Sequence, residues 1–295
     1  KRVAVIGGGP SGLSAAYYLQ IMGHQTTVYE MLPKLGGMLR YGIPNYRLPK
    51  DRLEEDTDAI IATGVEVKHG LKLGVDLMLP DLKKEYDAIL ITIGASTDKK
   101  LGLEGENAKG VMSAVKFLRN VGIEKYDDLT GHNVAIIGGG NVAMDAARTA
   151  LRLGAETHIV YRRSEEELPA RVEEVHHAKE EGIIFDVLTN PVEIIEDENG
   201  WVKGCKCIRM ELGEPDESGR RRPQEVPNSE FVIECDTVIM SLGTSPNPLI
   251  SSTTKGLESN KWGCLIAKDE NGETTKTGVY LSLIHISEPT RQAEI

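Results

Sequence analysis

The stretch that decides the fold opens with Arg2-Val-Ala-Val-Ile-Gly7-Gly-Gly9-Pro-Ser-Gly12 and closes with Thr26-Thr-Val-Tyr-Glu30. An apolar strand that enters a glycine-rich turn, continues as a helix and ends in a second apolar strand is typical of a βαβ unit. The glycine at position 23 marks the end of the helix. Residues 2–30 are therefore predicted to form strand, turn, helix and strand in that order.

The same plan occurs a second time. Asn133-Val-Ala-Ile-Ile-Gly138-Gly-Gly140-Asn-Val-Ala143 repeats the strand and the turn, and Thr157-His-Ile-Val-Tyr-Arg162-Arg163 repeats the closing strand. Residues 238–243 then repeat the ending of residues 89–94, an apolar strand that runs into glycine. This internal duplication predicts an α/β protein with two Rossmann-like dinucleotide-binding domains, each a three-layer (ββα/βαβ) arrangement, the second inserted into the first.

Composition narrows the range of partners. The 295 residues carry a formal net charge of −11, which repels polyphosphate backbones, so we expect no nucleic-acid partner. No run of about 18 apolar residues and no secretory signal pattern occurs, so we expect a cytoplasmic protein that does not bind a membrane. The four cysteines show neither CxxC nor metal-site spacing, and we expect buried or half-buried thiols in strands and no metal.

The first glycine turn has the chemistry of a dinucleotide site. Backbone N–H groups and the positive end of the helix dipole converge there, which suits a pyrophosphate. Gly7 is predicted to permit the tight turn, Gly9 to let the phosphates approach, and Gly12 to let helix and strand pack closely. Glu30, at the end of the second strand, is placed to accept hydrogen bonds from the adenosine ribose hydroxyls.

This first motif fits either FAD or NAD, and a second loop separates them. Leu35-Gly-Gly37-Met-Leu39-Arg40-Tyr-Gly-Ile43-Pro44 follows soon after Glu30. A bare nicotinamide site has no need of such a loop, whereas the ribityl chain and ring of a flavin need backbone close by. The sequence therefore favours FAD at the first turn.

The second motif departs from the first in two places. Ala143 replaces the third glycine, which is tolerated because only a small side chain fits at that contact. Arg162, followed by Arg163, aligns with Glu30 if a loop one residue longer is allowed. Guanidinium groups bind a ribose 2′-phosphate bidentately, so NADPH is predicted over NADH. The alternative is that both arginines are ordinary surface charges.

Several motifs together carry a family resemblance that covers Lys1 to Tyr280. They are residues 36–44 with Arg47-Leu-Pro-Lys50, residues 137–148, residues 161–171 and residues 243–247. On these the chain resembles the small (beta) subunit of NADPH-dependent glutamate synthase and its relatives, which include dihydropyrimidine dehydrogenase and a ferredoxin:NADP oxidoreductase subunit. The resemblance implies a flavoprotein whose NADPH domain is inserted into a discontinuous FAD domain.

The resemblance also implies the residues of both sites. The FAD site is expected to be lined by Gly7, Gly9, Pro10, Ser11, Gly12, Glu30, Gly37, Leu39, Arg40, Ile43 and Arg47. The NADPH site is expected to be lined by Gly139, Gly140, Asn141, Val142, Asp145, Arg162, Arg163 and Arg171. For Asp145 a second interpretation is a solvated or capping carboxylate in the first helical turn. No side chain is assigned a catalytic role, because the cofactors carry the chemistry.

The expected domain bounds are 1–112 and 244–280 for FAD and 113–243 for NADPH. Residues 281–295 look like a translated sequencing adapter, so we expect a non-native tail on a fragment. Family members carry an N-terminal cysteine-rich segment with iron–sulfur clusters and a glycine–aspartate segment after Tyr280, and we expect both in the intact parent only.

The predicted function is hydride transfer from NADPH to FAD. In the intact parent the electrons would pass to iron–sulfur clusters and to a glutamate synthase large subunit, or another iron–sulfur or redox partner, for glutamate biosynthesis. One alternative is a ferredoxin-linked or electron-bifurcating NADP oxidoreductase subunit. Another, from a different class, is a non-catalytic nucleotide-binding or assembly subunit.

Overall fold

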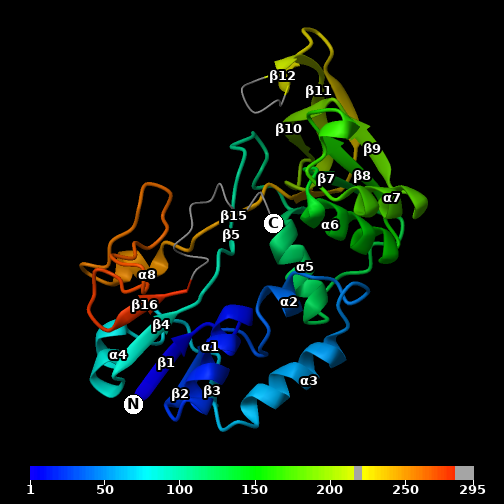
Figure 1. The fold of residues 1–295 in the computed structure, drawn as a ribbon. Coiled ribbons are helices and arrows are strands. Elements are labelled where there is room, and N and C mark those ends of the chain that lie inside the picture. Colours follow the sequence, from blue (N-terminus) through cyan, green and yellow to red (C-terminus); the bar gives the residue numbers. More distant parts are fainter. Residues whose placement is uncertain (216–220, 283–295) are drawn as a thin grey trace. The chain divides into compact units, whose positions relative to one another are not determined.

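The computed structural model describes residues 1–215 and 221–282 (Figure 1). The chain divides into two compact units, one made of Lys1–Thr97 with Thr244–Ile295 and the other of Asp98–Gly243. Two short strands, β5 (Thr97–Asp98) and β15 (Thr244–Ser245), pair with each other where the chain leaves and re-enters the first unit. The domain bounds expected from the sequence remain proposals; in the structure residues 98–112 belong to the second unit.

The first unit is built on a parallel sheet with the strand order β16-β4-β1-β2-β3. Its strands are β1 (Arg2–Ile6), β2 (Gln25–Glu30), β3 (Glu66–His69), β4 (Ala88–Ile91) and β16 (Val279–Leu281). Its helices are α1 (Pro10–Ile21), α2 (Met38–Tyr41), α3 (Lys50–Ile61), α4 (Leu79–Glu85) and α8 (Leu249–Thr253).

Both faces of this sheet are buried, which explains the near-continuous apolar strands. Alternate residues of β1 point to opposite faces. Ala4 and Ile6 pack in a cluster with residues of α4 and α8, and Val5 packs in a second cluster with Leu13 and Ala16 of α1. Helix α1 begins at a proline, whose fixed φ suits the first helical position, and is followed by Gly23 with φ +88°. Helix, sheet and helix therefore form three layers.

The second unit repeats this parallel sheet in the order β6-β14-β7-β8-β9. Its parallel strands are β6 (Val111–Ser113), β7 (Asn133–Ile137), β8 (Glu156–Tyr161), β9 (Ile184–Val187) and β14 (Thr237–Met240). Its helices are α5 (Ala114–Gly122), α6 (Asn141–Arg152), the short 3₁₀ helix η1 (Glu165–Glu167) and α7 (Val172–Glu180).

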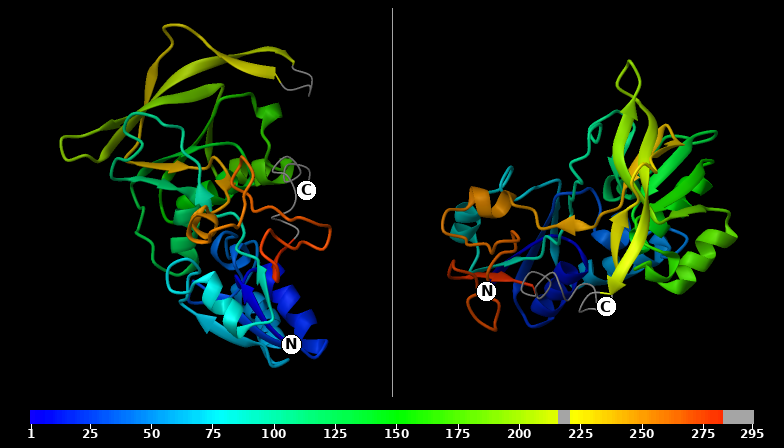
Figure 2. Two further views of the ribbon diagram at one scale, coloured as in Figure 1. Left: turned by 90° about the vertical axis from the view of Figure 1, so that its left-hand side faces the viewer. Right: turned by 90° about the horizontal axis from the view of Figure 1, so that it is seen from above.

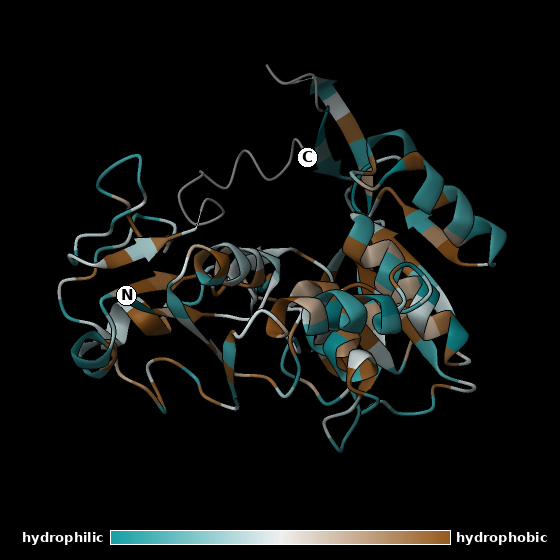
Figure 3. Cartoon of the chain, turned by 60° about the horizontal axis from the view of Figure 1, so that its bottom comes forward, coloured by the Kyte–Doolittle hydropathy of each residue, from teal (hydrophilic) through white to brown (hydrophobic). Residues whose placement is uncertain are grey.

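An antiparallel sheet covers the other face of this unit. Its strands are β10 (Thr189–Glu196), β11 (Val202–Pro215), β12 (Arg221–Glu225) and β13 (Phe231–Glu234). On β7, Val134 and Ile136 pack with the helices, whereas Ala135 and Ile137 pack with Cys205 and other residues of the antiparallel sheet. In Figure 3 the helices carry brown residues beside teal ones, as expected for helices that bury one side. The predicted α/β class, with two three-layer Rossmann-like domains and one inserted into the other, is confirmed.

The structure bears on two further expectations. All four cysteines are free and buried, but only Cys205 and Cys207 lie in a strand; Cys235 follows β13 and Cys264 lies in a loop. Of the expected tail, 283–295 lies outside the described residues, and Leu281 ends strand β16.

Across the described residues, none of the helices combines the length and apolar character needed to cross a membrane.

Candidate functional site

The first glycine turn joins β1 to α1, and the fold itself requires two of its glycines. Gly7 has φ +111°, and a Cβ there would lie 2.6 Å from the carbonyl oxygen of Thr92. A Cβ on Gly12 would lie 1.9 Å from the carbonyl oxygen of Gly7, so only glycine lets the helix pack this closely. The predicted roles of Gly7 in the turn and of Gly12 in helix packing are confirmed.

Neither the backbone angles nor the contacts within the protein require a glycine at position 9. Its φ of −80° is ordinary, and the nearest atom to an added Cβ is the Cα of Gly37 at 3.7 Å, a normal contact. The N-terminus of α1 receives no side-chain cap at this residue. Pro10 and Ser11, in the first turn of the helix, are exposed. The missing side chain therefore leaves the positive end of α1 open to an anion that approaches from outside the protein.

Glu30 lies beside the turn, as the sequence predicts. It is the last residue of β2 and is 5% exposed. Its Oε2 accepts a hydrogen bond from the backbone N–H of Gly8 at 2.8 Å, and its Oε1 accepts one from Leu32 at 2.7 Å. A carboxylate has about four acceptor sites, so two remain for other donors, such as ribose hydroxyls.

The second glycine-rich loop packs directly on the first turn. The backbone N–H of Gly36 donates to the carbonyl oxygen of Gly8 at 2.8 Å. A Cβ on Gly37, which has φ +51°, would lie 2.7 Å from the Cα of Gly9. A side chain at Gly37 would therefore force the loop and the turn apart. The two glycine-rich segments therefore form one site.

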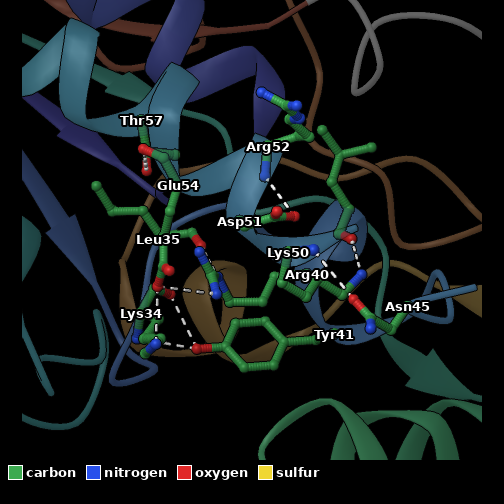
Figure 4. Close-up of polar contacts among 11 residues, drawn as sticks. Lys34, Leu35, Arg40, Tyr41, Asn45, Lys50, Asp51, Arg52, Glu54 and Thr57 are labelled. Atoms are coloured by element: carbon green, nitrogen blue, oxygen red, sulfur yellow. Dashed lines mark hydrogen bonds and ion pairs between the residues drawn. The ribbon is translucent and has the colours of Figure 1, made fainter. Parts of the chain in front are cut away.

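Helix α3 holds the second loop through a buried guanidinium (Figure 4). Arg40 is 4% exposed, and its Nε donates to the carbonyl oxygen of Leu35 at 2.6 Å. Its Nη1 lies 3.4 Å from Oε1 of Glu54, which also accepts a hydrogen bond from Nζ of Lys34 at 2.8 Å. The hydrogen bond from Lys34, helped by the charge of Arg40, lowers the pKa of Glu54. These contacts give Arg40 a part in shaping the loop.

Lys50 closes the other end of the loop. Its Nζ donates to the carbonyl oxygens of Leu39 at 2.7 Å and of Ile43 at 2.6 Å. Burial, with a smaller contribution from the charge of Arg40, lowers the pKa of Lys50 to about 8. Leu39, Ile43 and Arg47 are half-buried.

Sequence reasoning missed Lys50 and Glu54 as parts of this site. Lys50 is part of the motif Arg47-Leu-Pro-Lys50, on which the family resemblance partly rests, but the sequence alone assigned no role to this lysine. Glu54 gives no local signal, because its partners Lys34 and Arg40 lie in a separate segment.

The second turn, between β7 and α6, repeats the glycine pattern. Gly138 has φ +136°, and a Cβ there would lie 2.3 Å from the carbonyl oxygen of Ser241. Gly140 has φ −87°, and nothing lies within 4 Å of the position of its Cβ. The third position is Ala143, which is fully buried. Gly140, like Gly9, is a glycine for which the protein itself gives no reason.

The residue that corresponds to Glu30 in the second unit is Tyr161. Each directly follows the strand residue whose carbonyl accepts the N–H of the first glycine of the turn. Each also packs on the middle glycine: Glu30 meets the Cβ position of Gly8, and the Tyr161 ring meets that of Gly139. The predicted alignment of Arg162 with Glu30 is therefore wrong by one residue, because both units have the same spacing and no longer loop intervenes.

A loop that carries Arg171 docks on the second turn. The backbone N–H of Ala170 donates to the carbonyl oxygen of Gly139 at 3.2 Å, and that of Arg171 donates to Oδ1 of Asn141 at 2.9 Å. Val142 is exposed at the start of α6. The structure thus brings four of the predicted residues together at one turn, namely Gly139, Asn141, Val142 and Arg171.

Asp145 is neither solvated nor in the first helical turn, so that interpretation of it is wrong. Helix α6 begins at Asn141, which makes Asp145 its fifth residue, and its side chain is 5% exposed. Contact between Asp145 and a nucleotide stays a prediction.

Arg162 and Arg163 follow the end of β8 and line a pocket. Arg162 is exposed and Arg163 is half-buried, and Nε of Arg163 is buried without a hydrogen-bond partner in the described part of the chain. The pocket is lined by Arg162, Arg163, Asn190, Met210, Arg222, Pro223 and Glu225. Contact of Arg162 and Arg163 with a 2′-phosphate stays a prediction.

Comparison with known proteins agrees with this geometry. The chain is 44% identical to the "NADP(+)-dependent formate dehydrogenase subunit beta" of Moorella thermoacetica over 95% of this chain and 40% of that protein. It is 36% identical to the "Glutamate synthase [NADPH] small chain" of Escherichia coli over 94% of this chain and 61% of that protein. The chain thus spans about two fifths and three fifths of these two relatives. The predicted resemblance is confirmed.

The fold matches that of a solved structure, Mycobacterium tuberculosis FprA in complex with NADPH, with a TM-score of 0.79. The sequences are 20% identical, and the match covers 99% of this chain and 81% of that one. The family model for pyridine nucleotide-disulphide oxidoreductases matches residues 1–282. This match confirms the predicted enzyme class as an oxidoreductase of pyridine nucleotides, and it agrees with the predicted cofactor pair of FAD and NADPH. The chain belongs to the pyridine nucleotide-disulphide oxidoreductase family.

Proposed function

We propose that the first unit holds FAD, that the second holds NADPH, and that the protein transfers a hydride between them. The observation that carries the proposal is the pair Gly9 and Gly140. Each is the N-cap residue directly before a helix, each has ordinary backbone angles, and at each the surrounding protein atoms leave room for a side chain. The fold does not need glycine at these two helix N-termini. A bound pyrophosphate accounts for it, because the absence of a side chain lets the phosphates approach the protein backbone.

In the first unit the residues fit FAD. The open N-terminus of α1 would receive the pyrophosphate, and Glu30 would accept the ribose hydroxyls with its remaining acceptor sites. The loop that Arg40 and Lys50 hold against the turn would supply backbone to the flavin end. The full proposed set is Gly7, Gly9, Pro10, Ser11, Gly12, Glu30, Gly37, Leu39, Arg40, Ile43 and Arg47.

In the second unit the residues fit NADPH. Asn141 and Val142 start the helix that would receive the pyrophosphate, and the loop ending at Arg171 docks beside it. Tyr161 takes the place beside this turn that Glu30 takes in the first unit, and the guanidinium groups that follow suit a 2′-phosphate. The full proposed set is Gly139, Gly140, Asn141, Val142, Asp145, Arg162, Arg163 and Arg171.

When bound, the flavin supplies hydride-accepting chemistry, and the chain's own contribution is binding and orientation. The cysteines do not offer a route onward. All four are buried, and a hydrogen bond with the Cys207 thiol, together with burial, raises the pKa of Cys205, while burial raises that of Cys235 to about 12. A thiol rather than a thiolate is a poor nucleophile for disulfide exchange. The electrons therefore need another acceptor.

We infer that this acceptor is an iron–sulfur or other redox partner. The relatives named above are subunits of larger redox enzymes, and one of them is the small chain of glutamate synthase. In one version of this proposal, the chain delivers electrons to a glutamate synthase large subunit. In the other, the chain is part of a different NADP-linked electron-transfer subunit, and the higher identity to the formate dehydrogenase subunit, 44% against 36%, supports this second version.

Anaerobic addition of NADPH to the FAD-loaded chain tests the core of the proposal. Loss of the yellow flavin absorbance is expected, at a rate that depends on NADPH concentration and is slow with NADH. Stable binding of both nucleotides without bleaching would instead indicate a non-catalytic binding subunit. The reduced chain is then mixed with each candidate iron–sulfur partner. The rate at which the flavin is re-oxidised ranks the partners as electron acceptors.

A further inference from the structure

The ribbon of β11 and β12 extends the antiparallel sheet of the second unit. The first half of β11 pairs with β10 and β13, and its second half pairs with β12, with Met210 opposite Glu225 and Leu212 opposite Pro223. Figure 2 shows β11 continuing with β12 beyond the strands that flank its first half. The ribbon belongs to the antiparallel sheet and not to the parallel one, so contacts outside the parallel sheet must hold it in position.

Arg221 ties this ribbon to the segment that follows the predicted 2′-phosphate arginines. Its backbone N–H and its Nε both donate to Oε1 of Glu167, at 3.1 Å and 3.3 Å. Its Nη2 lies 3.4 Å from Oγ of Ser164, which directly follows Arg163. Three contacts from one residue hold the start of β12 against this segment.

The next residue along β12, Arg222, then lines the same pocket as Arg162 and Arg163. None of these three guanidinium groups forms an ion pair within the described part of the chain, and Glu225 is the pocket's single carboxylate among the described lining residues. Three cations gathered around one hollow repel one another unless an anion lies between them. The excess of two positive charges matches a phosphate, which carries up to two negative charges near neutral pH.

We propose that Arg222 is a third guanidinium for the 2′-phosphate of NADPH and sets the preference for NADPH over NADH. Arg221 acts as the positioning residue, since its bonds to Glu167 place the ribbon. This inference rests on the proposed function, in which the second unit holds NADPH. It adds Arg222 to the proposed 2′-phosphate site, although Arg222 lies about 60 positions along the chain from Arg162 and Arg163.

The test is titration calorimetry of the chain with NADPH, NADH, 2′,5′-ADP and 5′-AMP. Arg222→Ala is expected to raise the Kd for NADPH and 2′,5′-ADP roughly tenfold or more, as for a lost hydrogen bond to a charged group. The Kd for NADH and 5′-AMP should stay within about twofold. Arg222→Lys keeps the charge without the bidentate geometry, so its loss should be intermediate.

Arg221→Ala should reproduce the fall in the ratio of NADPH to NADH affinity, which a general loss of stability would not change. Lys116→Ala, which removes an exposed charge on α5, is the matched control and should leave all four Kd values unchanged. Melting curves check that each variant is folded.

The outcomes separate this inference from the function on which it rests. If Arg162→Ala lowers the NADPH preference but Arg222→Ala does not, the role of Arg222 is overturned and the NADPH site stands. If the unaltered chain binds NADPH and NADH equally, or neither, the NADPH site and the role of Arg222 are both overturned.

Discussion

Tyr161 occupies beside the second glycine turn the place that Glu30 occupies beside the first. The two residues have the same strand register and pack on equivalent glycines, yet one presents a carboxylate and the other a phenol whose hydroxyl donates to the carbonyl oxygen of Glu167 at 2.8 Å. A carboxylate in this place would repel a 2′-phosphate. We therefore expect the exchange of Glu30 for Tyr161 to give the two turns different preferences for the ribose.

Arg162→Ala should weaken NADPH binding and leave NADH binding nearly unchanged. Each charge-assisted contact to the phosphate contributes about 1.5–3 kcal/mol, so the Kd for NADPH should rise by roughly one to two orders of magnitude. Fluorescence titration with both nucleotides measures the two values. Equal losses for NADPH and NADH would contradict a 2′-phosphate role for this arginine.

Gly9→Ala and Gly140→Ala should each remove one cofactor without unfolding the chain. The added methyl meets no protein atom closer than 3.7 Å at Gly9 and none within 4 Å at Gly140. It would, however, stand where a pyrophosphate approaches. We expect lost FAD content for Gly9→Ala and a much weaker Kd for NADPH for Gly140→Ala, with unchanged melting temperatures.

Gly12→Ala is the contrasting variant for that pair. Its methyl group would lie 1.9 Å from a carbonyl oxygen, so α1 would have to move away from the turn. Overpacking of this kind costs about 1–3 kcal/mol or more. Denaturant titration should show this loss, and FAD binding should fall with it. Unchanged stability of Gly12→Ala would contradict the packing described for the first turn.

Glu30→Ala should lower both stability and FAD affinity. The backbone N–H groups of Gly8 and Leu32 would lose their acceptor, at about 1–3 kcal/mol for each buried donor left unpaired. Glu30→Gln keeps one oxygen as an acceptor and should recover part of the stability but little of the FAD affinity. Flavin content after reconstitution, read beside the unfolding free energy, separates the two effects.

Lys50 should make stability depend on pH in the alkaline range. Its pKa is about 8 in the folded chain against 10.5 for an ordinary lysine, so between these values the unfolded chain binds more protons. Unfolding free energy rises with pH wherever that is so. The contribution of Lys50 should therefore increase from about pH 8 to about pH 10.5 and be flat below this window.

Lys50→Met removes this contribution and serves as the reference. The difference in unfolding free energy between the unaltered chain and Lys50→Met, measured by denaturant titration, should grow across the window. A difference that shrinks as pH rises would show that the folded structure favours the charged lysine.

Much of the architecture followed from local patterns. The two strand–turn–helix–strand repeats are visible because apolar periodicity and glycine positions act over a few residues. The substitution of Ala143 for the third glycine was interpretable for the same reason, since a small side chain suffices at that contact. The register beside the second turn was predicted one residue out, because a loop one residue longer was allowed there, whereas both units have the same spacing from the first glycine to the residue that packs on the middle glycine.

The sequence by itself determined the duplicated βαβ units, their glycine turns and the family to which the chain belongs, because these depend on short spacings and on residue type. Only the tertiary structure decided that Arg222 joins Arg163 at one pocket, that Glu54 holds Arg40, and that Lys50 caps the loop at Ile43. Such contacts join segments that lie apart in the chain, and the sheet pairings and loop paths that bring them together leave no mark on the local sequence pattern.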